Sequence, residues 1–156
     1  MFNYNEWLMK SIYNSYDTRE LIERIDLLDE NSKTLEGNLT AEMLYRQMLI
    51  ELDIAFGKQD IKVSGLKKTL SKLFRNQFIK NALTQESHDY YYRKHPKELN
   101  IFELKLELIQ KINRLGNQGK HAIMKMHHPF WGKMTYTDWD KFVWNYLDNH
   151  LKQFGV

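Results

Sequence analysis

The stretch HPFWGKMTYTDWDKFVWNYLDNHLKQFGV, residues 128–156, decides the fold of this chain. We expect a helix to open at Thr137, with Asp140 at the reciprocal capping position three residues later. The side chains that then follow the i, i+3, i+4 spacing of one helix face are Trp139, Phe142, Val143, Tyr146, Leu147, His150 and Leu151. This pattern predicts a long C-terminal helix that turns one face to a core.

Three segments upstream show the same helical spacing. Their predicted starts are Asp17, Thr40 and Asn100, each a capping residue followed by an acidic residue in the first turn. The helix that begins at Asn100 is expected to end near Leu115, before a glycine. Because no segment alternates as a strand does, the predicted fold class is all-α, most simply a four-helix bundle.

An additional basic helix is predicted between the second and third of these helices, at residues 66–80. This segment contains no acidic residue, and its cations are Lys67, Lys68, Lys72, Arg75 and Lys80. A basic helix can lie on anionic lipid or on phosphate. Phe74 and Phe78 favour packing on the bundle instead, and the net charge of the whole chain is only +3. Nucleic acid and membrane are therefore not expected as partners.

The composition bounds the remaining possibilities. A chain of 156 residues suits one domain, and residues 1–16 are expected to form an N-terminal extension of it. The absence of cysteine excludes disulfides, zinc ribbons, iron–sulfur clusters and thiolate nucleophiles. No signal peptide and no run of eighteen apolar residues is present, so a cytoplasmic protein is expected.

Two pairs of polar residues interrupt the apolar helix faces. Gln47 and Glu51 lie four apart on the second predicted helix, and Tyr146 and His150 lie four apart on the last. If the pairs face each other, they form a polar cluster whose members must satisfy one another or bind water. Two simpler interpretations stay open: Glu51 edges the stripe and reaches solvent, and His150 is a hydrogen-bonded core histidine.

The spacing of the histidines argues against a histidine-rich metal site. The chain has six: His88, His95, His121, His127, His128 and His150. No two are three or four residues apart, as two ligands on one helix face must be. His127 and His128 precede Pro129 and are predicted to lie on an irregular segment, away from the polar cluster. Phe130 and Trp131 are expected to wedge between helices.

The closing motif resembles one branch of the DinB/YfiT-like superfamily, a set of four-helix-bundle proteins regarded as metal-dependent enzymes. In that branch the C-terminus reads HP-F/Y-F-GKLT, then a Trp-bearing helix, then HLDHHLRQFG. The residues of this chain that match are His128, Pro129, Phe130, Gly132, Lys133, Trp139, Leu147, Asp148, His150, Leu151, Gln153, Phe154 and Gly155. Residues 39–57 resemble the second helix of the branch more loosely, and the resemblance spans about residues 17–156.

The resemblance implies a metal site whose ligands have changed here. The family uses three histidines, which fall by position on Gln47, Tyr146 and His150, and only the last is a histidine. Zn²⁺ and Ni²⁺ prefer imidazole, and a phenol ligates only when it ionises. We therefore expect no catalytic divalent metal and no other cofactor, with His150 at most a weak ligand.

The preferred hypothesis is a degenerate DinB-like protein that keeps an interhelical pocket for a small molecule or a partner. Because related folds often dimerise, the resemblance also implies a homodimer. The alternative is a metal-dependent transferase or hydrolase in which Glu51 and His150 bind the ion and Tyr146 polarises the substrate. Metal-free acid–base catalysis by Glu51, His150 and Tyr146 is a third possibility. A purely structural hydrogen-bonded triad is a fourth, so the sequence leaves open whether the protein is an enzyme.

Overall fold

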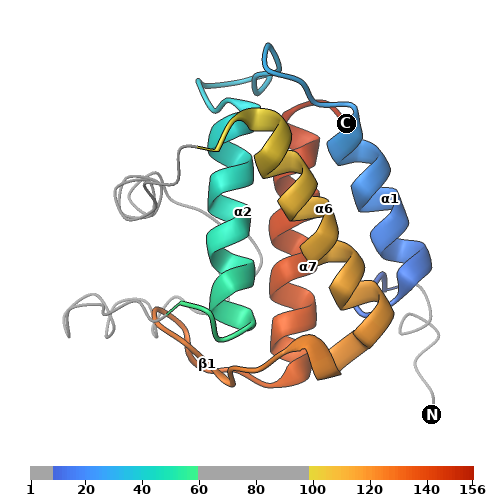
Figure 1. Cartoon of the computed structure of the whole chain (residues 1–156), viewed down its shortest axis with the longest axis vertical. Helices are drawn as coiled ribbons and strands as arrows, with labels where there is room; N and C mark the ends of the chain where they lie inside the picture. Colours follow the sequence, from blue (N-terminus) through green and yellow to red (C-terminus); the bar gives the residue numbers. More distant parts are fainter. Residues whose placement is uncertain (1–8, 60–98) are drawn as a thin grey trace.

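The computed structural model describes residues 9–59 and 99–156. Within them the chain forms four α-helices, one 3₁₀-helix and a two-stranded hairpin (Figure 1). In chain order the elements are α1 (Ser15–Asp26), α2 (Ala41–Ala55), α6 (Ile101–Gln118), η2 (Gly119–Ala122), β1 (His127–His128), β2 (Gly132–Lys133) and α7 (Tyr136–Gln153). The mostly helical character agrees with the expected class. The predicted basic helix at residues 66–80 lies outside the described residues.

Two of the predicted helix starts are confirmed. Thr40 is the N-cap of α2, and its side chain accepts a hydrogen bond from the backbone of Met43. Asn100 is the N-cap of α6 and forms a reciprocal capping box with Glu103. At both positions the capping signal lies within four consecutive residues, which is why the sequence alone locates it.

The predicted start of α1 is wrong by three residues. Its N-cap is Asn14, whose side chain accepts a hydrogen bond from the backbone of Tyr16. Asp17 lies inside the helix, where its carboxylate accepts a hydrogen bond of 2.9 Å from the backbone N–H of Ser11. Asp17 therefore holds the segment before the helix, in which Ile12 is fully buried.

The predicted start of α7 is wrong by two residues. Thr135 is the N-cap and Asp138 completes its capping box, in place of the expected Thr137 and Asp140. The carboxylate of Asp140 instead accepts hydrogen bonds of 2.8 Å from the hydroxyl of Ser11 and from the next backbone N–H. Partial burial raises the pKa of Asp140 above its ordinary value, although these two hydrogen bonds oppose the shift.

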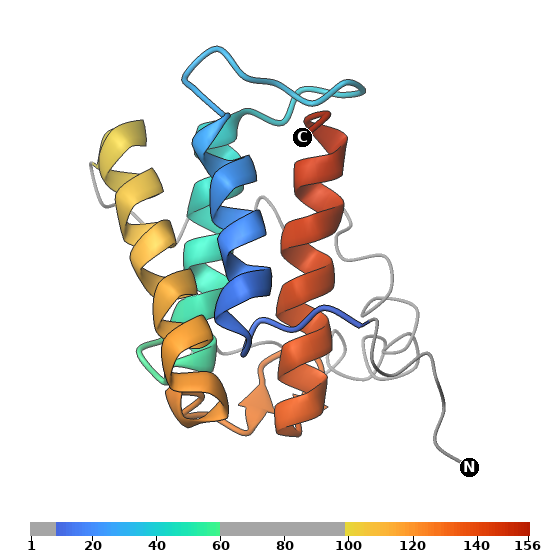
Figure 2. The same ribbon diagram turned by 90° about the vertical axis from the view of Figure 1, so that its right-hand side faces the viewer.

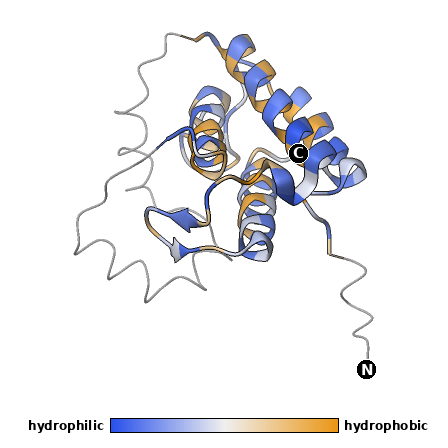
Figure 3. Ribbon diagram, turned by 60° about the horizontal axis from the view of Figure 1, so that its bottom comes forward, coloured by the Kyte–Doolittle hydropathy of each residue, from blue (hydrophilic) through white to orange (hydrophobic). Residues whose placement is uncertain are grey.

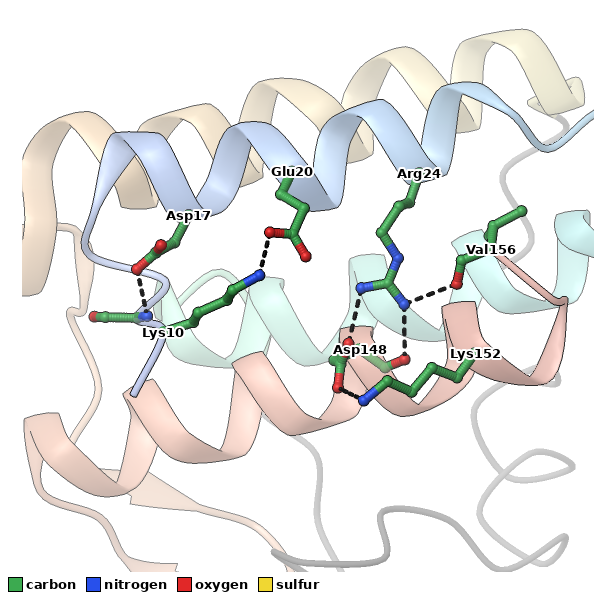
Figure 4. Close-up of polar contacts among 8 residues, drawn as sticks. Lys10, Asp17, Glu20, Arg24, Asp148, Lys152 and Val156 are labelled. Carbon is green, nitrogen blue, oxygen red and sulfur yellow. Dashed lines mark hydrogen bonds and ion pairs between the residues drawn. The ribbon is translucent and has the colours of Figure 1, made fainter. Parts of the chain in front are cut away.

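The first and last described helices run side by side in the same direction (Figures 1 and 2). Near the end of α1, Arg24 donates to the carboxylate of Asp148 on α7 at 2.8 Å and to the backbone carbonyl of Val156 at 2.9 Å (Figure 4). Lys152 binds the other oxygen of the same carboxylate at 2.6 Å. Lys10 and Glu20 form a second, more exposed ion pair beside α1.

Helix α6 is longer than predicted and packs very closely on α1. It continues through Gly116 to Gln118 instead of ending near Leu115. A Cβ atom at Gly116 would lie 2.3 Å from the hydroxyl of Thr18 and 3.2 Å from the Cα of Ser15. The glycine therefore serves the helix–helix contact, whereas we expected it to terminate the helix.

The hairpin closes one end of the helical core and appears as the pair of arrows in Figure 3. His127 pairs with Lys133 and His128 with Gly132, so the expectation of an irregular segment is wrong. Upstream of the hairpin, the backbone N–H groups of residues 124 and 125 both donate to the carbonyl of Ala55, at 3.0 and 3.2 Å. These bonds use a carbonyl that the last turn of α2 leaves without a helical partner.

The core is a single cluster to which all four helices contribute. Its largest fully buried side chains are Trp139 and Tyr45. The indole N–H of Trp139 donates to the carbonyl of Lys125 at 2.7 Å, which fastens α7 to the segment before the hairpin. None of the helices in the described part of the chain is long and apolar enough to cross a membrane.

Candidate functional site

The four predicted site residues lie together between α2 and α7. Gln47 and Glu51 come from α2, Tyr146 and His150 come from α7, and all four are buried. The hydroxyl of Tyr146 is 3.5 Å from the side-chain oxygen of Gln47, and the ring centroids of Tyr146 and His150 are 4.6 Å apart. The side chain of Glu51 lines the same gap as Tyr146. We call these four residues the polar cluster.

Tyr146 is held as a neutral phenol. Burial raises the pKa of Tyr146 well above 10, and the negative charge of Glu51 raises it further. The hydroxyl therefore keeps its proton and is directed at the carbonyl oxygen of Gln47. In this state Tyr146 can donate a hydrogen bond, but it cannot supply the phenolate oxygen that a metal ion requires.

The ring of His150 is oriented by its own helix. Its Nδ1 atom lies 2.6 Å from the backbone carbonyl oxygen of Tyr146, one turn earlier in α7. Because a carbonyl oxygen only accepts, Nδ1 must carry a proton there. In the neutral ring this leaves the lone pair on Nε2.

Glu51 has a partner that the sequence did not indicate. Its carboxylate oxygen lies 2.9 Å from Nε2 of His128, and the two side chains are 6% and 0% exposed. The expectation that His128 lies away from the cluster is therefore wrong, and so is the interpretation in which Glu51 reaches solvent. The contact joins residues 77 positions apart, so no local spacing could have indicated it.

The hairpin determines which nitrogen of His128 carries the proton. Its Nδ1 atom accepts hydrogen bonds from the backbone N–H groups of Phe130 and Trp131, at 3.1 and 3.3 Å. With Nδ1 accepting, the proton resides on Nε2 and is donated to Glu51. The ring stacks on Trp131 with 5.6 Å between centroids and meets Phe142 edge-on at 5.4 Å. His128 therefore fixes the hairpin against α2, and the partly buried rings of Phe130 and Trp131 pack beside it.

Between α2 and α7 the described residues line only a narrow gap beside the polar cluster. The gap between the two helices is lined by Met48, Glu51, Leu52, Phe142, Val143, Tyr146 and Leu147. Nothing in it is large enough for a water molecule to occupy. The members of the cluster thus contact each other and their apolar neighbours directly.

The donor set does not fit a catalytic divalent metal. Gln47 offers only an amide oxygen, Tyr146 is protonated, and one oxygen of Glu51 is bound to His128. Zn²⁺ and Ni²⁺ need several imidazole, thiolate or carboxylate ligands, and among these positions only His150 supplies an imidazole. Nowhere in residues 9–59 and 99–156 do three histidine, aspartate or glutamate side chains gather closely enough to hold an ion.

A second group of buried charges lies between α2 and α6. The ammonium of Lys111 is 2.7 Å from the carboxylate of Asp53 and 2.9 Å from that of Glu107. Sequence reasoning did not single out this triad, although Lys111 interrupts an apolar helix face. Beside it runs a groove of about 500 Å³.

Comparison with family models, with curated proteins and with solved structures finds no match to this chain.

Proposed function

We propose that this protein is a DinB-like four-helix bundle that has exchanged its metal site for a metal-free polar cluster. In this proposal it acts by binding a small molecule or a partner and carries no catalytic divalent ion. A homodimer and a cytoplasmic location stay predictions from the sequence.

The observation that carries the proposal is the state of Tyr146. It occupies the position of the second family histidine, it is fully buried, and its raised pKa keeps it protonated. Its hydroxyl faces Gln47, which occupies the position of the first family histidine. Two of the three ligand positions therefore satisfy each other, which supports a structural role for the cluster.

Metal content tests the proposal directly. The untagged protein, purified and analysed by inductively coupled plasma mass spectrometry, is expected to contain no stoichiometric zinc or nickel. Titration with either ion should give no saturable binding that depends on His150. One equivalent of metal in the wild type, lost in His150→Ala, would contradict the proposal and favour a metal-dependent transferase or hydrolase.

A rebuilt site gives the matched positive control. In Gln47→His/Tyr146→His, three imidazoles occupy the positions that the family uses, and Glu51 keeps its bond to His128. This variant is expected to bind one equivalent of Zn²⁺ or Ni²⁺, because imidazole replaces the amide and the phenol. Adding His150→Ala to the pair should abolish that binding. If the rebuilt protein folds but binds no metal, the correspondence of these positions with the family site is wrong.

A further inference from the structure

The groove that runs along α6, beside the segment that follows α2, has the size of a small-molecule site. Its volume is about 500 Å³, within the range of about 300–1,000 Å³ that is common for such sites. Phe56 from the end of α2 and Leu99 and Leu106 from the α6 side give it apolar walls. Leu106 is 48% exposed, so part of this apolar surface faces solvent in the described structure.

Two cations lie at one end of this groove. Arg114 is stacked on Phe56, with 4.6 Å from its guanidinium carbon to the ring centroid, and its Nε donates to Gln118 at 3.0 Å. Lys58 follows α2 directly and is exposed. Among the residues that the structure describes, neither cation forms an ion pair with a carboxylate. The two charges are therefore available to an anion at this end.

The carboxylates of the groove do not compensate these cations. Glu107 is bound to Lys111 on its own helix, and Asp53 holds the same lysine from α2. Glu103 accepts the backbone N–H of Asn100 and lies about 16 Å along α6 from Arg114, eleven residues at 1.5 Å each. The 30 residues 108–137 contain no acidic residue and include the cations Lys111, Arg114, Lys120, Lys125 and Lys133. No carboxylate of α6 therefore lies nearer to Arg114 along the helix than Glu107, which is bound to Lys111.

We propose that this groove binds a small amphipathic carboxylate. The carboxylate is held by Lys58 and Arg114, and the apolar chain lies along Leu106 toward Leu99. This inference rests on the proposed binding function and assigns a ligand class and a location to it. The location is separate from the polar cluster, because none of the four cluster residues lines the groove.

Calorimetric titration of the full-length protein with decanoate, below its micellar concentration, tests the site. The wild type is expected to bind one equivalent of decanoate, and decanol, which has the same chain without the charge, should bind about tenfold more weakly. Lys58→Gln/Arg114→Gln should weaken decanoate binding by about tenfold or more, because charged hydrogen bonds are lost. Lys120→Gln removes the same kind of charge outside the groove and should leave the affinity unchanged.

The apolar walls are tested separately. Leu106→Ser shortens an exposed side chain and should weaken decanoate about threefold while leaving binding of the two-carbon acid acetate unaffected. Absence of decanoate binding to the folded wild type, or equal affinity in Lys58→Gln/Arg114→Gln, would overturn the inference. Neither result changes the metal content of the protein, so failure of the groove is distinguishable from failure of the proposed metal-free cluster.

Discussion

His128 is the residue at which the hairpin, α2 and α7 meet. Its ring is completely buried, its Nε2–H is donated to Glu51, and both Trp131 and Phe142 contact it. Replacing His128 removes the partner of a carboxylate that has almost no access to water. The remaining charge must then be dehydrated without compensation, or the hairpin must open to admit solvent.

At the residue scale we therefore predict that His128→Phe lowers the free energy of unfolding by about 3 kcal/mol. Glu51→Gln retains an oxygen that accepts from Nε2–H and should cost about 1 kcal/mol. The double variant His128→Phe/Glu51→Leu removes both polar groups and should be more stable than His128→Phe alone. Urea unfolding followed by tryptophan fluorescence measures all three. Equal stability of wild type and His128→Phe would show that the pair contributes nothing.

At the scale of elements, α1 and α6 cross in close contact at Gly116. Alanine is normally the better helix residue by about 1 kcal/mol, so a glycine inside the last turn of α6 requires a reason. The reason is Thr18, whose hydroxyl would lie 2.3 Å from an added Cβ atom, and the backbone of Ser15 behind it. To relieve this overlap the Thr18 hydroxyl must rotate away from its bond to the Ser15 carbonyl, and the two helices must move slightly apart.

Gly116→Ala is therefore expected to destabilise the protein by about 1–3 kcal/mol despite its higher helix propensity. Thr18→Ala/Gly116→Ala removes the hydroxyl and should recover part of the loss. The control is Asn117→Ala on the exposed side of the same helix, which should change stability by less than about 0.5 kcal/mol. Thermal unfolding by circular dichroism distinguishes these variants, and a Gly116→Ala protein more stable than wild type would exclude the close contact.

At the scale of the whole molecule, Asp148 links the first and last described helices. Partial burial acts to raise the pKa of its carboxyl, but the hydrogen bonds and charges of Lys152 and Arg24 outweigh it, so the pKa lies below its ordinary value of 3.8. A carboxyl whose pKa is lowered by folding stabilises the native state above its unfolded pKa. That contribution disappears as the pH falls through the lower, folded value.

We predict that Asp148→Asn is less stable than wild type by about 1–3 kcal/mol at pH 7. The difference should begin to shrink as the pH falls below about 4 and should be small once the folded carboxyl is protonated. Glu20→Gln removes the more exposed pair with Lys10 and should cost less than about 1 kcal/mol at any pH. Urea unfolding between pH 2.5 and about 7 checks this, and a gap that stays constant would exclude the ion pair as its cause.

The sequence predicted best where the structural signal is local. The caps at Thr40 and Asn100 need only a few consecutive residues, and they were predicted correctly. Residues 135–140, TYTDWD, contain two overlapping capping patterns, and local rules cannot choose between them. The choice is made by Ser11, which binds Asp140 from 129 positions away and leaves Thr135 and Asp138 to cap the helix.

In the candidate site, too, the local arrangement could be predicted from the sequence and the long-range contact could not. Helical spacing correctly predicted that Gln47 and Glu51 share one face of α2 and that Tyr146 and His150 share one face of α7. Each pair lies one turn apart on an otherwise apolar face, and the two faces meet. The pairing of Glu51 with His128 could not be inferred, since the histidine lies on a hairpin of two-residue strands. A buried carboxylate on an apolar stripe does signal that some partner must exist, but it does not say which.

The contacts between α1 and α7 also have a consequence for biosynthesis. The ribosome releases α1 before α2 and α6, whereas Asp140 and Asp148 emerge only after all three of these helices. Until then the nascent chain can assemble α1, α2 and α6, but one side of α1 and the buried segment around Ile12 lack their final partner. The contacts of α1 with α7 therefore form only after α7 has been synthesised, and until then that side of α1 stays exposed.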